Sequence, residues 1–179
     1  MDPSTTSTEY ELTYLAREIP AEVRSAMPIR LVDVYIPDDR NVSPCLRLRK
    51  KGHNYEITKK LAVSNADYSV HAEQTIALTQ AEFESLAVGH TRLVEKDRYA
   101  VTIAGRAGEV DIFSGRLEGL VLIDFEFENE QAMRDFKPPF CCLVNVTQQL
   151  LTRGGELAGK SYTEIADDLE AQGYRHLTF

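Results

Sequence analysis

Charged residues recur at every second position in several short segments of this chain. Glu9 and Glu11 come first, and the same spacing returns in Arg47 with Arg49, Lys96 with Arg98, Glu109 with Asp111, and Asp124 with Glu126 and Glu128. Residues two apart in a β-strand point to the same face, so each charged set shares one face and its apolar neighbours share the other. One such pair is typical of a solvated strand. So many together predict a sheet whose charged faces converge.

Length and charge limit the classes of protein that this chain can belong to. It has 179 residues, 43% of them apolar, which is enough for one substantial core. We expect a disordered polar tail over residues 1–8 and a single domain over 9–179. The net charge of −8 argues against nucleic acid as a partner, because backbone recognition needs a basic face. Long apolar runs and a signal-peptide pattern are missing from the sequence, so we expect no membrane and a cytoplasmic location.

The pattern of turns predicts about eight strands and three helices. The strands are expected near residues 9–15, 30–36, 45–50, 54–60, 69–78, 91–104, 108–113 and 119–128. Capping boxes start helices after Thr79 and after Ser161, the latter ending at Gly173, and another helix follows Glu128 until Pro138. Many strands with few helices indicate a mainly β (α+β) fold, a closed antiparallel eight-stranded barrel with a few covering helices.

Inside such a barrel the charged faces would form a polar tunnel. The acidic side would carry Glu9, Glu11, Glu73, Asp111, Asp124 and Glu126, and the basic side Arg47, Arg49, Lys60, Lys96 and Arg98. Buried charges are costly unless they are paired or bind an ion. Carboxylates can hold a hard divalent cation, and arginine and lysine can hold phosphates. The sequence therefore predicts a site for a small phosphorylated anion and a metal.

One further motif indicates another phosphate site. Residues 154–161 satisfy the phosphate-loop pattern Gly-x4-Gly-Lys-Ser. A phosphate loop follows a buried parallel strand, whereas residues 148–153 are short and half polar, and only 18 residues follow Ser161. We interpret the match as accidental.

In the segments with alternating charges, the chain resembles the CYTH proteins, also called triphosphate tunnel metalloenzymes. Residues 9–13 are similar to the family's Glu-x-Glu-x-Lys strand, with Thr13 in place of the lysine. Further similarities follow in the family's order at residues 46–49 (Leu-Arg-Leu-Arg), 58–60 (Thr-Lys-Lys), Glu73, 96–99 (Lys-Asp-Arg-Tyr), 109–115 (Glu-Val-Asp-Ile-Phe-Ser-Gly), 119–126 and 157–162. Thr75 and His71 stand where the family has a second glutamate and an arginine. The resemblance covers roughly residues 9 to 162.

The resemblance implies a tunnel that binds a triphosphate and Mg²⁺ or Mn²⁺. It assigns the metal to Glu9, Glu11, Asp124 and Glu126, and phosphate oxygens to Arg47, Arg49, Lys60, Lys96, Arg98 and Lys160. Glu73 and Asp111 would orient the attacking water or a second metal. Thr13 offers one neutral hydrogen bond where a lysine would offer a charge-assisted one.

Three functions remain open at this point. The expected one is a metal-dependent phosphohydrolase that acts on a small triphosphate, above all inorganic tripolyphosphate, with ATP or thiamine triphosphate as further substrates. The first alternative is an adenylate cyclase of the class IV type from the same family. The second is a non-catalytic phosphate or polyphosphate binding module. A homodimer is one assembly that the sequence leaves open.

Overall fold

The computed structural model describes residues 7–39, 41–42, 46–64 and 67–179, and it describes their side chains except those of residues 7–9, 60–64 and 67–73. Residues 1–6 of the expected tail lie outside this set, and Ser7 and Thr8 belong to the first strand. Cys45 is also outside it, whereas Cys141 and Cys142 are free and buried.

Nine strands form one antiparallel sheet in the described part of the chain. They are β1 (Ser7–Ala16), β2 (Ile29–Ile36), β3 (Leu46–Lys51), β4 (Asn54–Ser64), β5 (Asp67–Leu78), β6 (Leu93–Ile103), β7 (Arg106–Phe113), β8 (Val121–Phe127) and β9 (Cys142–Asn145). Their order is β5-β4-β3-β2-β6-β7-β8-β1-β9. The mainly β fold and the eight expected strands are present, and β9 was not expected.

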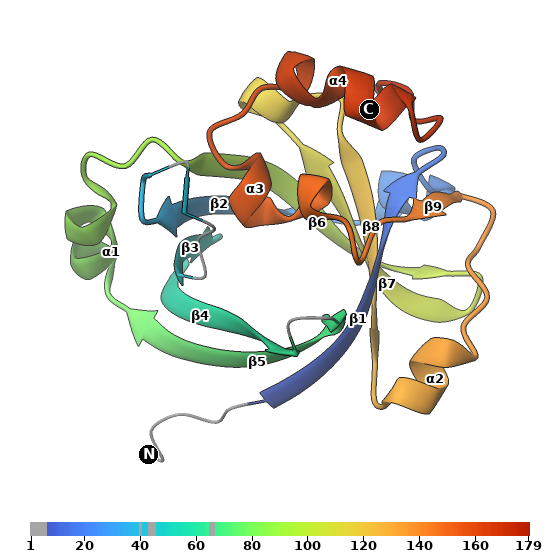
Figure 1. Cartoon of the computed structure of the whole chain (residues 1–179), viewed down its shortest axis with the longest axis horizontal. Coiled ribbons are helices and arrows are strands. Elements are labelled where there is room, and N and C mark those ends of the chain that lie inside the picture. The colour runs from blue at the N-terminus through green and yellow to red at the C-terminus, as the bar shows by residue number, and fades with distance from the viewer. Residues whose placement is uncertain (1–6, 40, 43–45, 65–66) are drawn as a thin grey trace.

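The prediction of a closed eight-stranded barrel was wrong. The sheet has nine strands, and β9 continues it beyond β1 at one edge. At the other edge, β5 meets only the first residues of β1, from Ser7 opposite Glu73 to Tyr10 opposite Val70, and on that same side of β1 the last residues, from Tyr14, pair with β9. Figure 1 shows the resulting sheet, which curves strongly around an inner side. We call the side that carries Glu11, Arg49 and Arg98 the inner face.

Helices cover parts of the outer face. The capping box at Thr79 starts α1 (Gln80–Ala87), as expected, and its Phe83 packs against Val34 and Leu48. Asn129 caps α2 (Glu130–Arg134) by accepting a hydrogen bond from the amide of Ala132 at 2.9 Å. Both helices lie outside the curve of the sheet (Figure 1).

The C-terminal segment packs against one end of the inner face. The capping box of Ser161 and Glu164 starts α4 (Tyr162–Glu170), which ends just before the predicted Gly173 and buries Ile165 and Leu169. The short α3 (Gly154–Leu157) and the 3-10 turns η1 (Ala21–Ser25), η2 (Gly115–Leu117) and η3 (Leu150–Thr152) were not expected. Leu157, Ile165 and Leu169 join inner-face residues such as Leu15 and Leu122 in one apolar cluster.

A second apolar cluster lies on the outer face, where Val110, Ile123 and Phe125 pack with residues of α2 and β9. The alternation seen in the sequence thus separates the charged residues of the strands from this apolar cluster.

A phosphate loop at residues 154–161 finds no support, since α3 follows a 3-10 turn and every described strand pairing is antiparallel. No helix among the described residues has the length and apolar character needed to cross a membrane.

Candidate functional site

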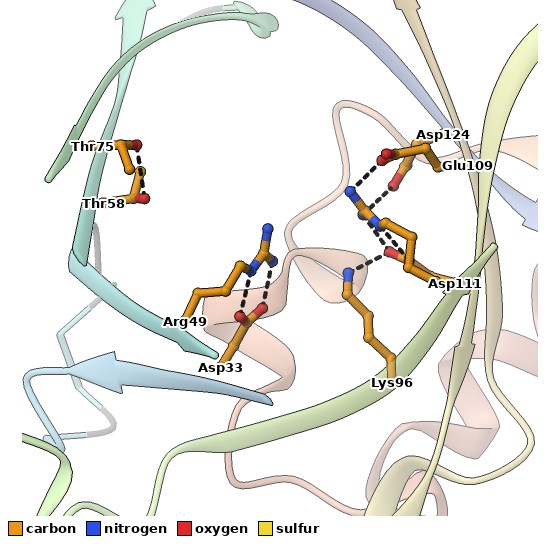
Figure 2. A network of polar contacts seen from close by, with 9 residues as sticks. Asp33, Arg49, Thr58, Thr75, Lys96, Glu109, Asp111 and Asp124 are labelled. Atoms are coloured by element: carbon orange, nitrogen blue, oxygen red, sulfur yellow. Dashed lines mark hydrogen bonds and ion pairs between the residues drawn. The ribbon is translucent and has the colours of Figure 1, made fainter. Parts of the chain in front are cut away.

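Strand register brings the predicted charges to the inner face. Residues directly opposite each other in an antiparallel pair point to the same side. Such pairs join Glu11 with Glu126, Thr13 with Asp124, Arg98 with Asp111, and Lys60 with Glu73. Figure 2 shows how the described side chains from β2, β3, β6, β7 and β8 point toward one another inside the curve. The convergence expected from the alternating charges is therefore present.

Arg49 is held by an aspartate that the sequence analysis missed. Its Nε and Nη2 each donate a hydrogen bond of 2.7 Å to one oxygen of Asp33, on the neighbouring strand β2. Burial alone would raise the pKa of Asp33, but the hydrogen bonds and charge of Arg49 outweigh it and lower that pKa. Burial would lower the pKa of Arg49, but the hydrogen bonds and charge of Asp33 outweigh it and raise that pKa. This pair fixes the direction in which Arg49 points.

Asp111 anchors two cations. It is fully buried, and it accepts hydrogen bonds from Arg98 Nε at 2.7 Å and Nη2 at 2.6 Å, as well as one from Lys96 Nζ. Burial would raise the pKa of Asp111, but the charge of Lys96 and the hydrogen bonds of Arg98 lower it well below its usual range. For Lys96, burial outweighs the attraction of Asp111 and lowers the pKa. Asp111 is thus an ionised carboxylate with its oxygens already occupied.

Glu11, Asp124 and Glu126 form an acidic wall on the inner face. Within this wall, the carboxylate of Asp124 is incompletely hydrogen-bonded. Its Oδ2 receives a long hydrogen bond of 3.4 Å from Arg98, while its buried Oδ1 has no hydrogen-bond partner. Burial, followed by the charges of Glu11 and Asp111, raises the pKa of Asp124 to about 7. Thr13, directly opposite Asp124, donates a hydrogen bond of 3.3 Å to Oε1 of Glu11. Glu126 lies next to Glu11 in the register and is exposed.

Arg47 keeps hydrogen-bonding capacity in the interior. Its side chain hydrogen-bonds Tyr35, directly opposite it on β2, and its buried Nε has no partner. Tyr35 is itself buried beside Gly154 at the start of α3. Arg47 is therefore connected through Tyr35 to the start of α3.

Four predicted residues are placed less completely. The side chains of Glu9, Lys60 and Glu73 lie outside the described set, although their strand positions put them on the inner face, with Glu73 opposite both Lys60 and Ser7. Lys160 is half-buried between α3 and α4, and its amide donates to the carbonyl of Leu157 at 2.9 Å. Two residues from Lys60 and Glu73, on the same two strands, Thr58 and Thr75 share a hydrogen bond of 2.9 Å. Thr75 stands where the family has a second glutamate.

The sequence analysis missed Asp33 and Tyr35, and it missed the structural role of Glu109. Asp33 and Tyr35 form one alternating pair on β2, but only one of the two is charged, so a search for paired charges passes over them. Glu109 was seen in the pattern and given no role, yet it forms an ion pair with Nη1 of Arg98. Alternation of any polar group, rather than charge alone, would have found all three.

The donor chemistry of the acidic wall fits a hard divalent cation. Mg²⁺ and Mn²⁺ prefer carboxylate oxygens, and the buried, unsatisfied Oδ1 of Asp124 beside Glu11 is such a ligand. Within the described residues, no three His, Cys, Asp or Glu side chains gather closely enough to enclose a metal ion. Glu9, whose side chain is outside that set, belongs to the same strand face.

Comparisons with known proteins agree with this geometry. The inorganic triphosphatase of Nitrosomonas europaea is 34% identical to the chain over 136 residues, which are 74% of this chain and 84% of that protein. A crystal structure of an inorganic triphosphatase superposes with a TM-score of 0.62 at 28% identity, covering 89% of this chain and 98% of the other. A protein from Hippeastrum with a dominant triphosphatase activity has a TM-score of 0.52 at 10% identity, covers 89% and 95% of the two chains, and shows the fold alone. No protein-family model matches.

Proposed function

The chain belongs to the CYTH family, the triphosphate tunnel metalloenzymes, and from this premise we propose that it hydrolyses inorganic tripolyphosphate with the help of a divalent cation. It is a triphosphate hydrolase by its relation to the inorganic triphosphatase of Nitrosomonas europaea. The observation that supports the finer proposal is the inner face itself, where Arg49 with its partner Asp33 stands across the interior from Asp124 and Glu109 (Figure 2).

Glu9, Glu11, Asp124 and Glu126 are the proposed ligands of Mg²⁺ or Mn²⁺. When bound, such an ion neutralises the negative charge that develops on a transferring phosphoryl group. The raised pKa of Asp124 supports this role, because a carboxylate crowded by Glu11 and Asp111 gains from a nearby cation. Thr13 supports it by its hydrogen bond to Glu11, which directs one oxygen of that side chain.

The proposed phosphate contacts are Arg47, Arg49, Lys60, Lys96, Arg98 and Lys160. Arginine forks match phosphate oxygens, and a buried charge that is already oriented loses little entropy on binding. Asp33 orients Arg49, and Asp111 orients Lys96 and Arg98. Arg47 has a buried Nε–H that a phosphate oxygen can satisfy.

Glu73 and Asp111 are proposed to serve the attacking water in different ways. Glu73 is proposed to orient the water directly, since its strand position faces the same interior. The contacts of Asp111 favour an indirect role, because both oxygens already accept hydrogen bonds from Arg98 and Lys96. We propose that Asp111 positions these two cations around the phosphates.

The direct test is product analysis with a panel of substrates. Tripolyphosphate, ATP and thiamine triphosphate are each incubated with the protein and Mg²⁺ or Mn²⁺, and orthophosphate, pyrophosphate and cyclic nucleotide are quantified. We expect orthophosphate and pyrophosphate from tripolyphosphate, with no release after chelation of the metal. Cyclic nucleotide with pyrophosphate from ATP would instead establish the cyclase alternative. Binding without any product would establish the non-catalytic module.

A matched pair of variants links the products to the inner face. Arg47→Ala removes a proposed phosphate contact, whereas Arg24→Ala removes an exposed arginine of η1. We expect Arg47→Ala alone to raise KM for tripolyphosphate. An equal KM for tripolyphosphate in the two variants would contradict the proposed phosphate contact at Arg47.

The cytoplasmic location and the homodimer stay predictions.

A further inference from the structure

Arg98 contacts three carboxylates of the interior at once. Its Nε and Nη2 donate to Asp111 at 2.7 and 2.6 Å, Nη2 also reaches Asp124 at 3.4 Å, and Nη1 forms an ion pair with Glu109. A guanidinium binds phosphate best through two parallel N–H groups on one edge. The edge formed by Nη1 and Nη2 is the one that Glu109 and Asp124 occupy, so Arg98 is directed at carboxylates rather than at a ligand.

The three contacts differ in how easily they can be exchanged. The Asp111 side chain is 0% exposed and also holds Lys96, so its pair with Arg98 is fixed. The Glu109 side chain is 30% exposed and makes a contact from the opposite side of the guanidinium. Glu109 and Asp124 are directly opposite each other in the pairing of β7 with β8. A divalent cation that binds Asp124 would therefore have Glu109 beside it as a further oxygen ligand.

We propose that Glu109 is a positioning residue that holds Arg98 away from the phosphates and turns toward the metal ion when the metal binds. This inference rests on the proposed function. With a cation bound, Glu109 and Asp124 would turn from Arg98 toward the metal, Asp111 would keep its hydrogen bond to Nε of Arg98, and the Nη1–Nη2 edge would become available to tripolyphosphate. Metal and substrate then strengthen each other's binding, and the coupling is reciprocal, as in any linked equilibrium.

Two binary titrations by calorimetry test the role of Glu109. Each uses the whole chain and either tripolyphosphate with a chelator or Mn²⁺ alone, so that no metal–tripolyphosphate complex forms in solution. The variant is Glu109→Gln, which removes the charge and keeps the size of the side chain. The matched control is Glu56→Gln, because Glu56 is a half-buried inner-face glutamate opposite Arg49, with no described contact to Arg98. Both variants lose one negative charge from the same interior.

We expect Glu109→Gln to bind metal-free tripolyphosphate about tenfold more tightly than Glu56→Gln does, and Mn²⁺ about tenfold more weakly, which is within the usual range of coupling. Loss of one negative charge alone would tighten tripolyphosphate binding to a similar extent in both variants, so the difference between them reports the contact of Glu109 with Arg98. Equal affinities of the two variants for tripolyphosphate and for Mn²⁺ would overturn the role of Glu109 while leaving the proposed function in place. A wild-type protein that binds no tripolyphosphate, with or without metal, would overturn the proposed function and this inference with it.

Discussion

Asp124 and Arg47 each keep one buried polar atom without a partner on the inner face. These atoms are Oδ1 of Asp124 and Nε of Arg47. An unsatisfied buried donor or acceptor costs about 1–3 kcal/mol, so the protein without ligands carries this cost at both atoms. A bound cation would recover it at Asp124 and a bound phosphate at Arg47. On the proposed function, the two residues would bind opposite ends of one metal–tripolyphosphate complex.

The exchange Glu11→Gln tests the acidic pole. Glutamine keeps the size of the side chain but lowers the negative charge that a divalent cation requires, so we expect metal-dependent release of orthophosphate to fall on the order of a hundredfold, as when one electrostatic stabiliser is removed. Glu18→Gln, at an exposed position after β1, serves as the control. Unchanged melting temperatures would show that both variants fold. Wild-type turnover in Glu11→Gln would contradict the metal assignment.

Thr13→Lys tests the position where the chain departs from the family pattern. The register places residue 13 opposite Asp124, so a lysine there would add a cation within reach of a phosphate bound at the acidic wall. We expect tripolyphosphate to bind more tightly by about 1.5–3 kcal/mol, the usual gain from a hydrogen bond to a charged group. Calorimetric titration of both proteins measures the difference. Weaker binding would show that Arg98 or Lys96 already fills this space and repels the new charge.

At the scale of elements, the sequence predicted the strands and helix starts better than their closure. Alternation predicted all eight of the longer strands, and the capping boxes at Thr79 and Ser161 predicted α1 and α4. β9 and α3 have four residues each, too few for a period to show. Closure depends on which strands lie at the edges, and this is decided by packing between distant segments.

The site could be predicted as a set of residues but not as a set of contacts. Periodicity placed Arg49, Arg98 and Asp111 on a common face, and the register confirms this. Which carboxylate each cation meets depends on the stagger between strands, so the pairs of Arg49 with Asp33 and of Arg98 with Glu109 could not be inferred. Strand position alone does not separate a ligand-binding charge from one that orients its neighbour.

The packing of α3 against β2 leads to a test of how the C-terminal segment is held. A Cβ atom on Gly154 would lie 2.1 Å from the hydroxyl oxygen of the buried Tyr35. We expect Gly154→Ala to destabilise the protein by about 1–3 kcal/mol through overpacking, measured by denaturant unfolding. In a Tyr35→Phe background the same exchange should cost less, because the clashing oxygen is gone. An equal cost in both backgrounds would contradict this explanation.

The contact between β2 and β3 predicts how stability depends on pH. The pKa of Asp33 is lowered in the folded state, so its contribution to stability is present above the unfolded pKa of about 3.9 and is lost as the pH falls through the folded pKa. Denaturant unfolding between pH 2 and pH 5 should show a steep loss in the wild type. The double exchange Asp33→Leu with Arg49→Met should flatten this acid limb. An unchanged slope would exclude the pair as its source.

At the scale of the whole molecule, the net charge hides an internal separation of charge. The chain carries −8 overall, yet its inner face brings Arg47, Arg49, Lys96 and Arg98 together. Asp33 and Asp111 form ion pairs with three of these cations and hold them in place, which leaves a net positive charge in this group. The fold thus keeps a cationic cluster, the proposed phosphate site, inside an acidic protein, which disfavours long polyanions at the surface.

This arrangement predicts which anion should stabilise the whole protein. A ligand that binds only the folded state adds RT ln(1 + [L]/Kd), which is about 2.7 kcal/mol at a hundred times Kd. For a chain of this size that corresponds to a rise in melting temperature of roughly 5–10 °C. We expect tripolyphosphate with Mg²⁺ to give such a rise in a thermal scan and orthophosphate to give far less, since the longer anion can contact more of the proposed cations and the metal at once. Arg47→Ala should reduce the shift and Arg24→Ala should not. Equal shifts from the two anions would mean that the phosphate contacts do not act together on one extended ligand.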